Sequence, residues 1–389
     1  MKCYLCSTEN SESILQMENY PLNSIYCAER TMNNQYRKNM NLYHCRSCGH
    51  FYAFSEVDIN DLYNNDYLYS PSSPNVQERA NFIDKELKKY SGIKFNRVID
   101  IGCNDTTLLK KISKSIQANY YIGIDPAIPN AIVESPDTFI LYKDFVQNII
   151  IPHFDPNLPD LVISDQTFEH IPNLNEVVEL IWQQTSNSSI ISICVPSFEA
   201  LMLKMNYNFV IHEHLHYFTL GRLVNLLESH GFSLKQHYID YQTTSNFLFT
   251  VFKKEDKQII SDFNRLLHGL IDFDNSFFLF KKSIDLYKNV MKCVNKNELT
   301  FGFGASDLTG NLAYFIDTDF DGFNCILDDT ESKQNKYIPF IVPNIIAPKN
   351  EDYTTCNVVI TAPQASRAIM NRLKEMKFKR IINPLGITY

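Results

Sequence analysis

The feature that most constrains the fold is a buried strand that runs into a glycine turn near residue 100. The segment Arg97-Val-Ile-Asp-Ile-Gly-Cys-Asn-Asp105 reads as a strand with its turn at Gly102, and a helical pattern follows over 106–115. A second strand, 120–125, ends in an acid. This order is typical of nucleotide-cofactor sites, where backbone amides approach the cofactor and the acid binds two ribose hydroxyls. An ordinary strand–helix–strand crossover is the alternative interpretation.

The turn itself favours one kind of cofactor. It lacks the repeated glycines that receive a pyrophosphate, and it looks more like the S-adenosylmethionine loop of class I methyltransferases. Ligands in open α/β sheets lie beyond the carboxyl ends of the strands, so we expect contacts from the turn, from the acid and from later strand ends. The candidate cofactor-binding residues are Asp100, Gly102, Asn104, Asp125, Asp144 and Gln166.

The alternation of strands and helices continues along the central part of the chain. The last helix of this part should begin after Thr219, a plausible N-cap, and stop at Gly231. Two closing strands form a hairpin, which is usual at the sheet's end in class I methyltransferases. The predicted fold is therefore α/β, with a doubly wound sheet. Strands are expected at 138–142, 160–165, 189–195, 232–238 and 246–252, and helices at 77–90, 173–183 and 220–229.

The densest cluster of titratable side chains is His212-Glu-His-Leu-His-Tyr-Phe218. A surface loop rarely needs so many such groups, and a buried core could not easily satisfy them. This histidine string follows a strand and enters from the cofactor edge of the sheet, where Glu169 and His170 follow another strand. Imidazole titrates near neutral pH, which suits a pocket that removes a proton from carbon. A polar loop with histidines bonded to the backbone is the alternative.

Two cysteine pairs near the N-terminus predict a metal site. The pairs Cys3-x-x-Cys6 and Cys45-x-x-Cys48 supply four thiolates, which suits a closed, structural zinc site of tetrahedral geometry. Gly49 should allow the tight turn that lets backbone amides face the sulfurs, and Cys27 is not an expected ligand. Coincidence in a cysteine-containing cytosolic chain is the alternative.

Charge and hydropathy disfavour several classes of function. The net charge is −8 without a long basic run, which argues against binding to a nucleic-acid backbone. No stretch approaches the ~20 apolar residues of a membrane span, and the N-terminus has no apolar signal region. We therefore expect a cytoplasmic protein whose cysteines are thiols or metal ligands.

The last part of the chain predicts a second, smaller α/β unit. A strand runs into Gly302-x-Gly304, another ends in Asp328-Asp329, and a third is followed by a helix over 364–376. This unit resembles a dinucleotide domain without the complete glycine fingerprint. The expected division is 1–75 for a zinc-binding unit and linker, 76–255 for the S-adenosylmethionine unit, 256–297 for a helical connector and 298–389 for the Rossmann-like unit.

Together these segments resemble the bacterial nucleotide-sugar C-methyltransferases, which combine a zinc-binding N-terminal domain, an S-adenosylmethionine domain and a C-terminal Rossmann-like domain. The resemblance covers nearly the whole length, and the histidine string is its most specific part. It rests on both cysteine pairs, Tyr67-Leu-Tyr69-Ser70, Asp100-Ile-Gly-Cys-Asn-Asp105, Val195-Pro-Ser-Phe-Glu199, the histidine string, Phe301-Gly-Phe-Gly-Ala305, Asp328-Asp329 and Lys333-Gln-Asn-Lys-Tyr337.

The resemblance implies the cofactors S-adenosylmethionine and Zn²⁺, and a nucleotide-activated keto-deoxysugar as substrate. A base removes the proton beside the ketone, and the enolate carbon takes the methyl group. Matched by position, His214 is implied as the base and Glu213 as its partner. His170 and Tyr67 are implied as groups that steady the enolate oxygen or the sugar ring. Such a reaction needs a base near neutral pKa and a donor where negative charge develops.

The chain departs from the family pattern at three places. Ile211 stands where a tyrosine precedes the string, Thr106 where the cofactor loop ends in glycine, and 243–247 lacks an arginine expected for substrate phosphate. Other functions stay open: an O- or N-methyltransferase on a sugar or small metabolite, or a non-catalytic relative that binds a nucleotide-sugar. A zinc-containing RNA methyltransferase or RNA-binding module is disfavoured by the acidic balance. The sequence specifies neither the sugar, the methylated carbon nor the oligomeric state.

Overall fold

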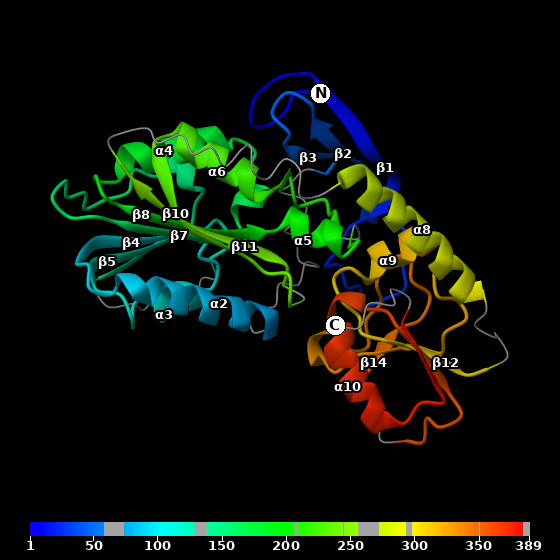
Figure 1. Ribbon diagram of the computed structural model, residues 1–389. Coiled ribbons are helices and arrows are strands. Elements are labelled where there is room, and N and C mark those ends of the chain that lie inside the picture. Colours follow the sequence, from blue (N-terminus) through cyan, green and yellow to red (C-terminus); the bar gives the residue numbers. More distant parts are fainter. Residues whose placement is uncertain are drawn as a thin grey trace.

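Over the residues that it describes, the computed structural model contains three β-sheets, of four, seven and five strands (Figure 1). In Figure 1 the four-stranded sheet lies near the N-terminus, and the seven-stranded sheet carries helices on both faces. Within the described part of the chain, no helix is long and apolar enough to cross a membrane. The structure describes residues 1–57, 74–128, 138–206, 209–243, 245–255, 272–292, 298–349 and 351–383.

The seven-stranded sheet has the order β10-β11-β8-β7-β4-β5-β6. Strands β4 to β8 are parallel, whereas β11 pairs antiparallel with both β8 and β10. The predicted hairpin at the end of a doubly wound sheet is therefore confirmed. The strands are β4 (Phe95–Ile101), β5 (Ala118–Ile124), β6 (Phe139–Tyr142), β7 (Leu161–Asp165), β8 (Ile190–Pro196), β10 (Phe232–Ile239) and β11 (Phe247–Lys254).

Helices cover both faces of this sheet because its strands are apolar on both sides. Figure 1 shows α4 (Leu174–Gln184) and α6 (Leu220–Ser229) over one face, and α2 (Pro74–Leu87) and α3 (Thr107–Ile112) over the other. Every residue of β4 is buried. Such continuous burial is typical of a parallel sheet between two helical layers. The cofactor turn is thus anchored on the most deeply buried part of the domain.

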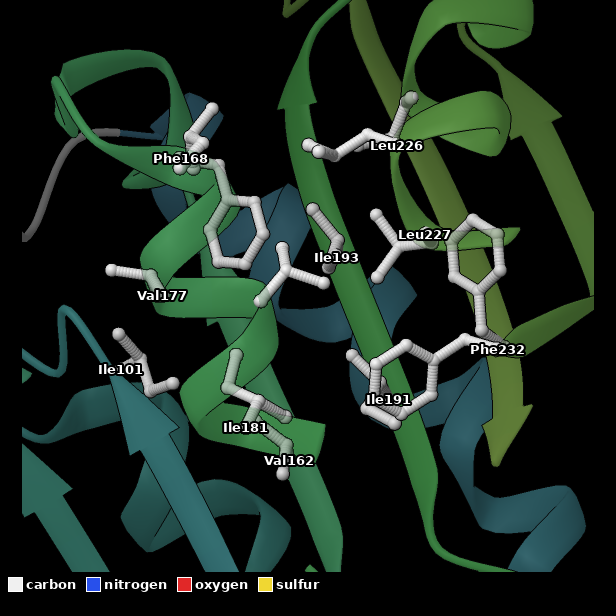
Figure 2. Packing of buried hydrophobic residues seen from close by; sticks show 14 of the residues in the cluster. Ile101, Val162, Phe168, Val177, Ile181, Ile191, Ile193, Leu226, Leu227 and Phe232 are labelled. Carbon is white, nitrogen blue, oxygen red and sulfur yellow. The ribbon is translucent and has the colours of Figure 1, made fainter. Parts of the chain in front are cut away.

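One hydrophobic core lies between the seven-stranded sheet and the helices α4 and α6. Figure 2 shows Ile193 of β8 between Val177 and Ile181 of α4 on one side and Leu227 of α6 on the other, and all four belong to the same cluster. These helix residues recur at spacings of three or four, which puts them on one side of an α-helix. The packing fixes where η5 (Phe168–His170), a short 3-10 helix between β7 and α4, can lie.

The start of α6 corrects one detail of the sequence interpretation. The helix has the predicted bounds, but the side chain of Thr219 makes no capping hydrogen bond. Instead, the backbone N–H of Leu220 donates to Oε1 of Glu199, at 2.6 Å. Burial raises the pKa of this carboxyl to about 7. Glu199, which lies before the histidine string in the chain, therefore caps α6, the helix that follows the string.

The N-terminal sheet has the order β1-β2-β3-β9 and is antiparallel throughout. Its fourth strand, β9 (His216–Tyr217), comes from the histidine string. Tyr52 of β3 pairs with His216, so the string is part of two units at once. The sheet packs on α5 (Phe198–Leu203) and on Phe280 of α8 (Phe273–Lys292). Its other strands are β1 (Ser11–Pro21), β2 (Arg37–Cys45) and β3 (Phe51–Ser55).

The C-terminal sheet has the order β14-β13-β12-β15-β16 and is parallel. The strands and helices of this sheet lie within the segment 298–389, where a second α/β unit was expected. A bridge between Cys27 and Tyr337 joins it to the chain after β1. Of the expected connector, 256–271 and 293–297 lie outside the described residues. The elements are β12 (Thr300–Phe303), α9 (Thr309–Ile316), β13 (Ile326–Leu327), β14 (Ile345–Ile346), β15 (Asn357–Ile360), α10 (Ser366–Met376) and β16 (Arg380–Ile382).

Candidate functional site

The turn after β4 lies directly against the turn after β7. Gly102 has a φ of +82°, and a Cβ built there would lie 1.9 Å from Oγ1 of Thr167. Glycine is therefore required both for the backbone conformation and for this close approach. The contact brings the predicted cofactor turn next to η5, which carries Glu169 and His170.

Thr106 occupies the left-handed conformation that glycine adopts most easily. Its φ is +66° and its ψ +11°, and its N–H donates to the carbonyl of Cys103 at 2.7 Å. A β-branched residue is unfavourable there. The turn therefore holds Thr106 at the expense of local backbone strain.

Asp125 and Asn104 are brought together as a cofactor site requires. The carboxylate of Asp125 accepts hydrogen bonds from the backbone N–H groups of Asn104, at 3.0 Å, and Ala127, at 2.6 Å. Burial raises the pKa of this carboxyl, and the two N–H groups oppose that shift. Each carboxylate oxygen keeps a second lone pair, so the side chain could still accept from two ribose hydroxyls.

Unpartnered polar atoms surround this turn. Oδ2 of Asp100, Oγ1 of Thr106 and Nε2 of Gln166 are buried without a hydrogen-bond partner within the described residues. Burial also raises the pKa of Asp100 well above its usual value. Buried polar groups in folded proteins are rarely left unpaired, so these atoms fit a turn that receives a polar cofactor.

Asp144 has a different local role from the other candidate cofactor residues. It is exposed after β6, and its carboxylate accepts from the N–H of Phe145, at 2.7 Å, and from Nδ2 of Asn148, at 2.8 Å. These contacts hold the short helix η4 (Val146–Asn148). One of its two oxygens, Oδ1, is thus engaged in holding the local backbone.

The three histidines of the string differ in whether their rings make hydrogen bonds to the described residues. His212 bonds through Nδ1 to Oγ of Ser55, at 2.8 Å, and through Nε2 to the carbonyl of Tyr20, at 3.1 Å. His216 also uses both ring nitrogens in hydrogen bonds. His214 is the one histidine of the string whose ring makes no hydrogen bond to any described residue. The alternative of histidines bonded to the backbone therefore fits His212 and His216 but not His214.

His214 lies beside His170. Their ring centroids are 4.9 Å apart, with the rings at 69°. Nδ1 of His170 lies 2.8 Å from the carbonyl oxygen of Glu213, which can only accept, so Nδ1 carries the proton and Nε2 keeps a lone pair. Burial lowers the pKa of His170 to about 4, and burial together with His170 lowers the pKa of His214 well below 6.5. Both rings are therefore neutral at neutral pH.

Two buried carboxyls flank these imidazoles. Glu169 is fully buried, both its oxygens lack a partner among the described residues, and burial raises its pKa to about 8. One oxygen of Glu169 and one ring nitrogen from each of His170 and His214 all lie within 4.8 Å of one another. Glu213 is buried as well, and its pKa is raised to about 7. Sequence reasoning had placed Glu169 at a strand end without giving it a role.

Three predicted features of the site need qualification. Tyr67 falls in 58–73, outside the described residues. Ile211 is buried, and its N–H donates to the hydroxyl of Tyr217 at 3.0 Å, so the phenol of the string is used to hold the backbone. The segment that lacks an arginine is contacted by Lys204 at the end of α5, whose Nζ donates to the carbonyl of Thr243 at 2.6 Å and to Oδ1 of Asn246 at 2.5 Å. No local sequence signal marked Lys204.

The four predicted metal ligands come together. The Sγ atoms of Cys3 and Cys48 are 3.7 Å apart, those of Cys6 and Cys45 are 3.5 Å apart, and all four lie within 4.8 Å of one another. Tetrahedral zinc with bonds near 2.3 Å places sulfurs about 3.8 Å apart, so the quartet fits such an ion. Gly49 has a φ of +74° and its N–H donates to Cys45, as the tight turn requires. The hydrogen bond from Cys48 lowers the pKa of Cys3 to about 5.

Comparison with known proteins agrees with this geometry. Residues 76–237 match the model of a methyltransferase domain family. With the doubly wound sheet, this defines the central part of the chain as a class I methyltransferase domain, a class that uses S-adenosylmethionine. The C-methyltransferase NovU of Streptomyces niveus is 26% identical over 172 residues, which cover 42% of this chain and 39% of that relative.

Several solved structures resemble the chain over about half its length. The N-methyltransferase NodS from Bradyrhizobium japonicum WM9, in complex with S-adenosyl-L-homocysteine, is 10% identical, with a TM-score of 0.38; the match covers 51% of this chain and 96% of that one. An S-adenosylmethionine-dependent methyltransferase from Mesorhizobium loti is 13% identical, with a TM-score of 0.34, and the match covers 41% of this chain and 92% of that one.

Proposed function

We propose that the protein is an S-adenosylmethionine-dependent C-methyltransferase that acts on a nucleotide-activated keto-deoxysugar through an enolate. The observation that carries the proposal is the position of His214, which lies beside His170 at the cofactor edge with its ring free of hydrogen bonds to the described residues. The match to a relative named as a C-methyltransferase supports carbon as the methyl acceptor.

His214 is the proposed base. Burial and His170 lower the pKa of His214 well below 6.5, so the ring is neutral and has a lone pair to offer. The same shift weakens it as a base, so catalysis requires a bound substrate or a nearby carboxylate to raise its basicity. His214 takes the proton from the carbon beside the ketone, and the C–H electron pair becomes the enolate. Glu213, which precedes His214 in the chain, is its proposed partner, because a carboxylate that approaches the ring during the reaction would offset the positive charge that His214 acquires.

His170 acts on the substrate in a more restricted way than the family resemblance implies. Its proton points from Nδ1 to the carbonyl of Glu213, so Nε2 can accept a hydrogen bond but cannot donate one. We therefore assign His170 to a hydroxyl of the sugar rather than to the enolate oxygen. Tyr67 keeps its proposed role as the donor to that oxygen, because a phenol O–H can stabilise developing negative charge.

The turn after β4 would hold the cofactor. We propose that Asp125 accepts from the ribose hydroxyls, that Asp100, Gly102, Asn104 and Gln166 line the turn, and that Asp144 contributes from its edge. The cofactor, when bound, supplies the electrophilic methyl group. We also propose that Cys3, Cys6, Cys45 and Cys48 hold a structural zinc ion, because four thiolates close the coordination shell and leave no open position.

Hydrogen exchange at carbon tests the carbon-acid step directly. The protein is incubated in D₂O with a nucleotide-linked keto-deoxysugar, with and without S-adenosylmethionine, and deuterium at the carbon beside the ketone is followed by NMR. We expect exchange with the wild type and a loss of at least about 100-fold in His214→Asn, because general-base catalysis typically contributes that much.

The control for this experiment is His237→Asn. His237 is exposed on β10, which lies at the far end of the same sheet, so exchange should be unchanged. Methyl transfer without exchange would indicate oxygen or nitrogen as the acceptor and would contradict the enolate. Exchange that survives in His214→Asn would leave the reaction class standing but overturn the assignment of the base.

A further inference from the structure

The carboxyl group of Glu213 is held from outside the central domain. It is 1% exposed, and its Oε1 accepts a hydrogen bond of 2.8 Å from Nδ2 of Asn23, which follows β1 of the N-terminal sheet. Asn23 is also buried, at 5% exposure. Oε2 of Glu213 and Oδ1 of Asn23 have no partner among the described residues. The amide of Asn23 is thus the donor that the structure provides for this carboxyl.

Two further contacts fix the position of Asn23. The hydroxyl of Tyr20 donates to the carbonyl of Val210 at 2.9 Å, and the carbonyl of Tyr20 lies 3.1 Å from Nε2 of His212. Residues 20–23 therefore run along residues 210–213 and bond to them at three points. Several contacts that fix the same segment hold a polar pair in one geometry.

The surroundings otherwise disfavour a charge on Glu213. Burial is the largest cause of its raised pKa and Asp307 of the C-terminal unit adds to it, whereas the backbone N–H of Glu213 itself and then the side chain of Asn23 oppose it. The backbone carbonyl of the same residue orients His170. The other titratable groups that interact with Glu213 are Tyr20 of β1 and Tyr217 of β9, and His212 and His214 are its neighbours in the chain.

We propose that Asn23 is a positioning residue for methyl transfer, which holds the buried carboxyl of Glu213 in one geometry and favours its ionised form. The proposal rests on the proposed function of His214 and Glu213. It assigns the N-terminal unit a part in the reaction, because this unit supplies the side-chain hydrogen bond that favours the ionised form of the buried carboxyl.

The pH dependence of methyl transfer separates this role from a merely structural one. Ionisation of Glu213 should produce the rising, acidic limb of the rate profile. In Asn23→Leu the donor is lost, so we expect the midpoint of that limb to move up by about one pH unit. In Asn23→Asp a second carboxyl faces the first, so we expect a larger upward shift.

A matched control exists in the same sheet. Nδ2 of Asn39 donates to Oε1 of Glu56 at 3.2 Å, and both residues are exposed. Asn39→Asp should leave the midpoint unchanged. Affinity for S-adenosylmethionine, measured by calorimetry, should be the same in all variants if they are folded. A fall in rate at every pH with an unmoved midpoint in both Asn23 variants would overturn the proposal.

A measurement that does not depend on activity keeps the two proposals separate. Infrared difference spectra recorded during a pH titration report the protonated carboxyl of Glu213, which is identified by its loss in Glu213→Gln. We expect that band to persist to higher pH in Asn23→Leu than in the wild type. An unchanged titration would overturn the role of Asn23. A wild type without methyl transfer but with the shifted titration would overturn the proposed function alone.

Discussion

His50 of the N-terminal unit donates a hydrogen bond to His216 of the histidine string, with Nε2 and Nδ1 3.0 Å apart. The direction follows from the other nitrogen of His216, which lies 2.9 Å from the carbonyl of Ile171 and must carry a proton to bond there. Because His50 follows Cys48 by two residues, the proposed zinc site and the string are connected by a short covalent and hydrogen-bonded path.

Loss of the metal should therefore affect the rate of methyl transfer. We expect Cys45→Ser, or treatment of the wild type with a chelator, to remove zinc and to lower the rate of methyl transfer by about tenfold or more, as loss of supporting contacts around a site commonly does. Metal content is measured by mass spectrometry, and protection of the backbone at 212–218 by hydrogen exchange. Cys27→Ser is the control, and equal effects of both substitutions would contradict a four-cysteine site.

Cofactor affinity should depend unequally on the two acids at the sheet's edge. In Asp125→Ala the dissociation constant for S-adenosylmethionine should rise at least about tenfold, because hydrogen bonds to a charged group are worth about 1.5–3 kcal/mol each. Asp144→Ala should lose less, since Asp144 is exposed and holds η4. Titration calorimetry measures both. Equal losses would show that Asp144 contacts the cofactor as strongly as Asp125.

The sequence predicted the elements whose signals are local. The helix 220–229 has the predicted bounds because its apolar spacing and Gly231 lie within the segment itself. The turn at Gly102 was recognisable for the same reason. By contrast, His216 pairs with Tyr52, a residue more than 160 positions away in the chain. A local sequence pattern cannot predict the pairing of strands that are so far apart.

The histidine string shows the same limit within the site. Composition marked the string as unusual, but which imidazole stays free depends on partners supplied by Ser55, Tyr20 and His50. The role of Asn23 had no sequence signal either, because a single asparagine after a strand is common in turns. Local chemistry thus predicted the candidate residues, and tertiary contacts distinguished their roles.

Thr106 offers a test of strain in the cofactor turn. Thr106→Gly should raise the free energy of unfolding by up to about 1 kcal/mol, because glycine adopts a φ of +66° without a steric penalty and no longer buries an unpartnered hydroxyl. The gain is limited by the greater flexibility of glycine in the unfolded chain. Denaturant unfolding measures it. The matched control is Thr107→Gly, one position further into α3, which should destabilise, and a loss of stability in Thr106→Gly would refute the interpretation.

Glu169 should make stability depend on pH in a defined direction. Burial raises its pKa from an ordinary value of 4.5 to about 8, so the folded state binds this proton more tightly than the unfolded chain. The stabilisation is complete below pH 4.5 and is lost as pH rises towards 8. Between pH 6.5 and 8, where histidines of the unfolded chain are mostly neutral, the loss should approach about 2 kcal/mol, at 1.4 kcal/mol per pH unit.

Replacement of the carboxyl isolates this contribution. Glu169→Gln cannot ionise, so its free energy of unfolding should fall less than that of the wild type over the same pH interval. The buried carboxyls Glu199 and Glu213 remain in both proteins and cancel in the comparison. Glu179→Gln, at an exposed position on α4, should behave as the wild type. Parallel pH profiles for Glu169→Gln and the wild type in denaturant unfolding would mean that Glu169 is ionised in the folded protein, compensated by a charge from the neighbouring imidazoles.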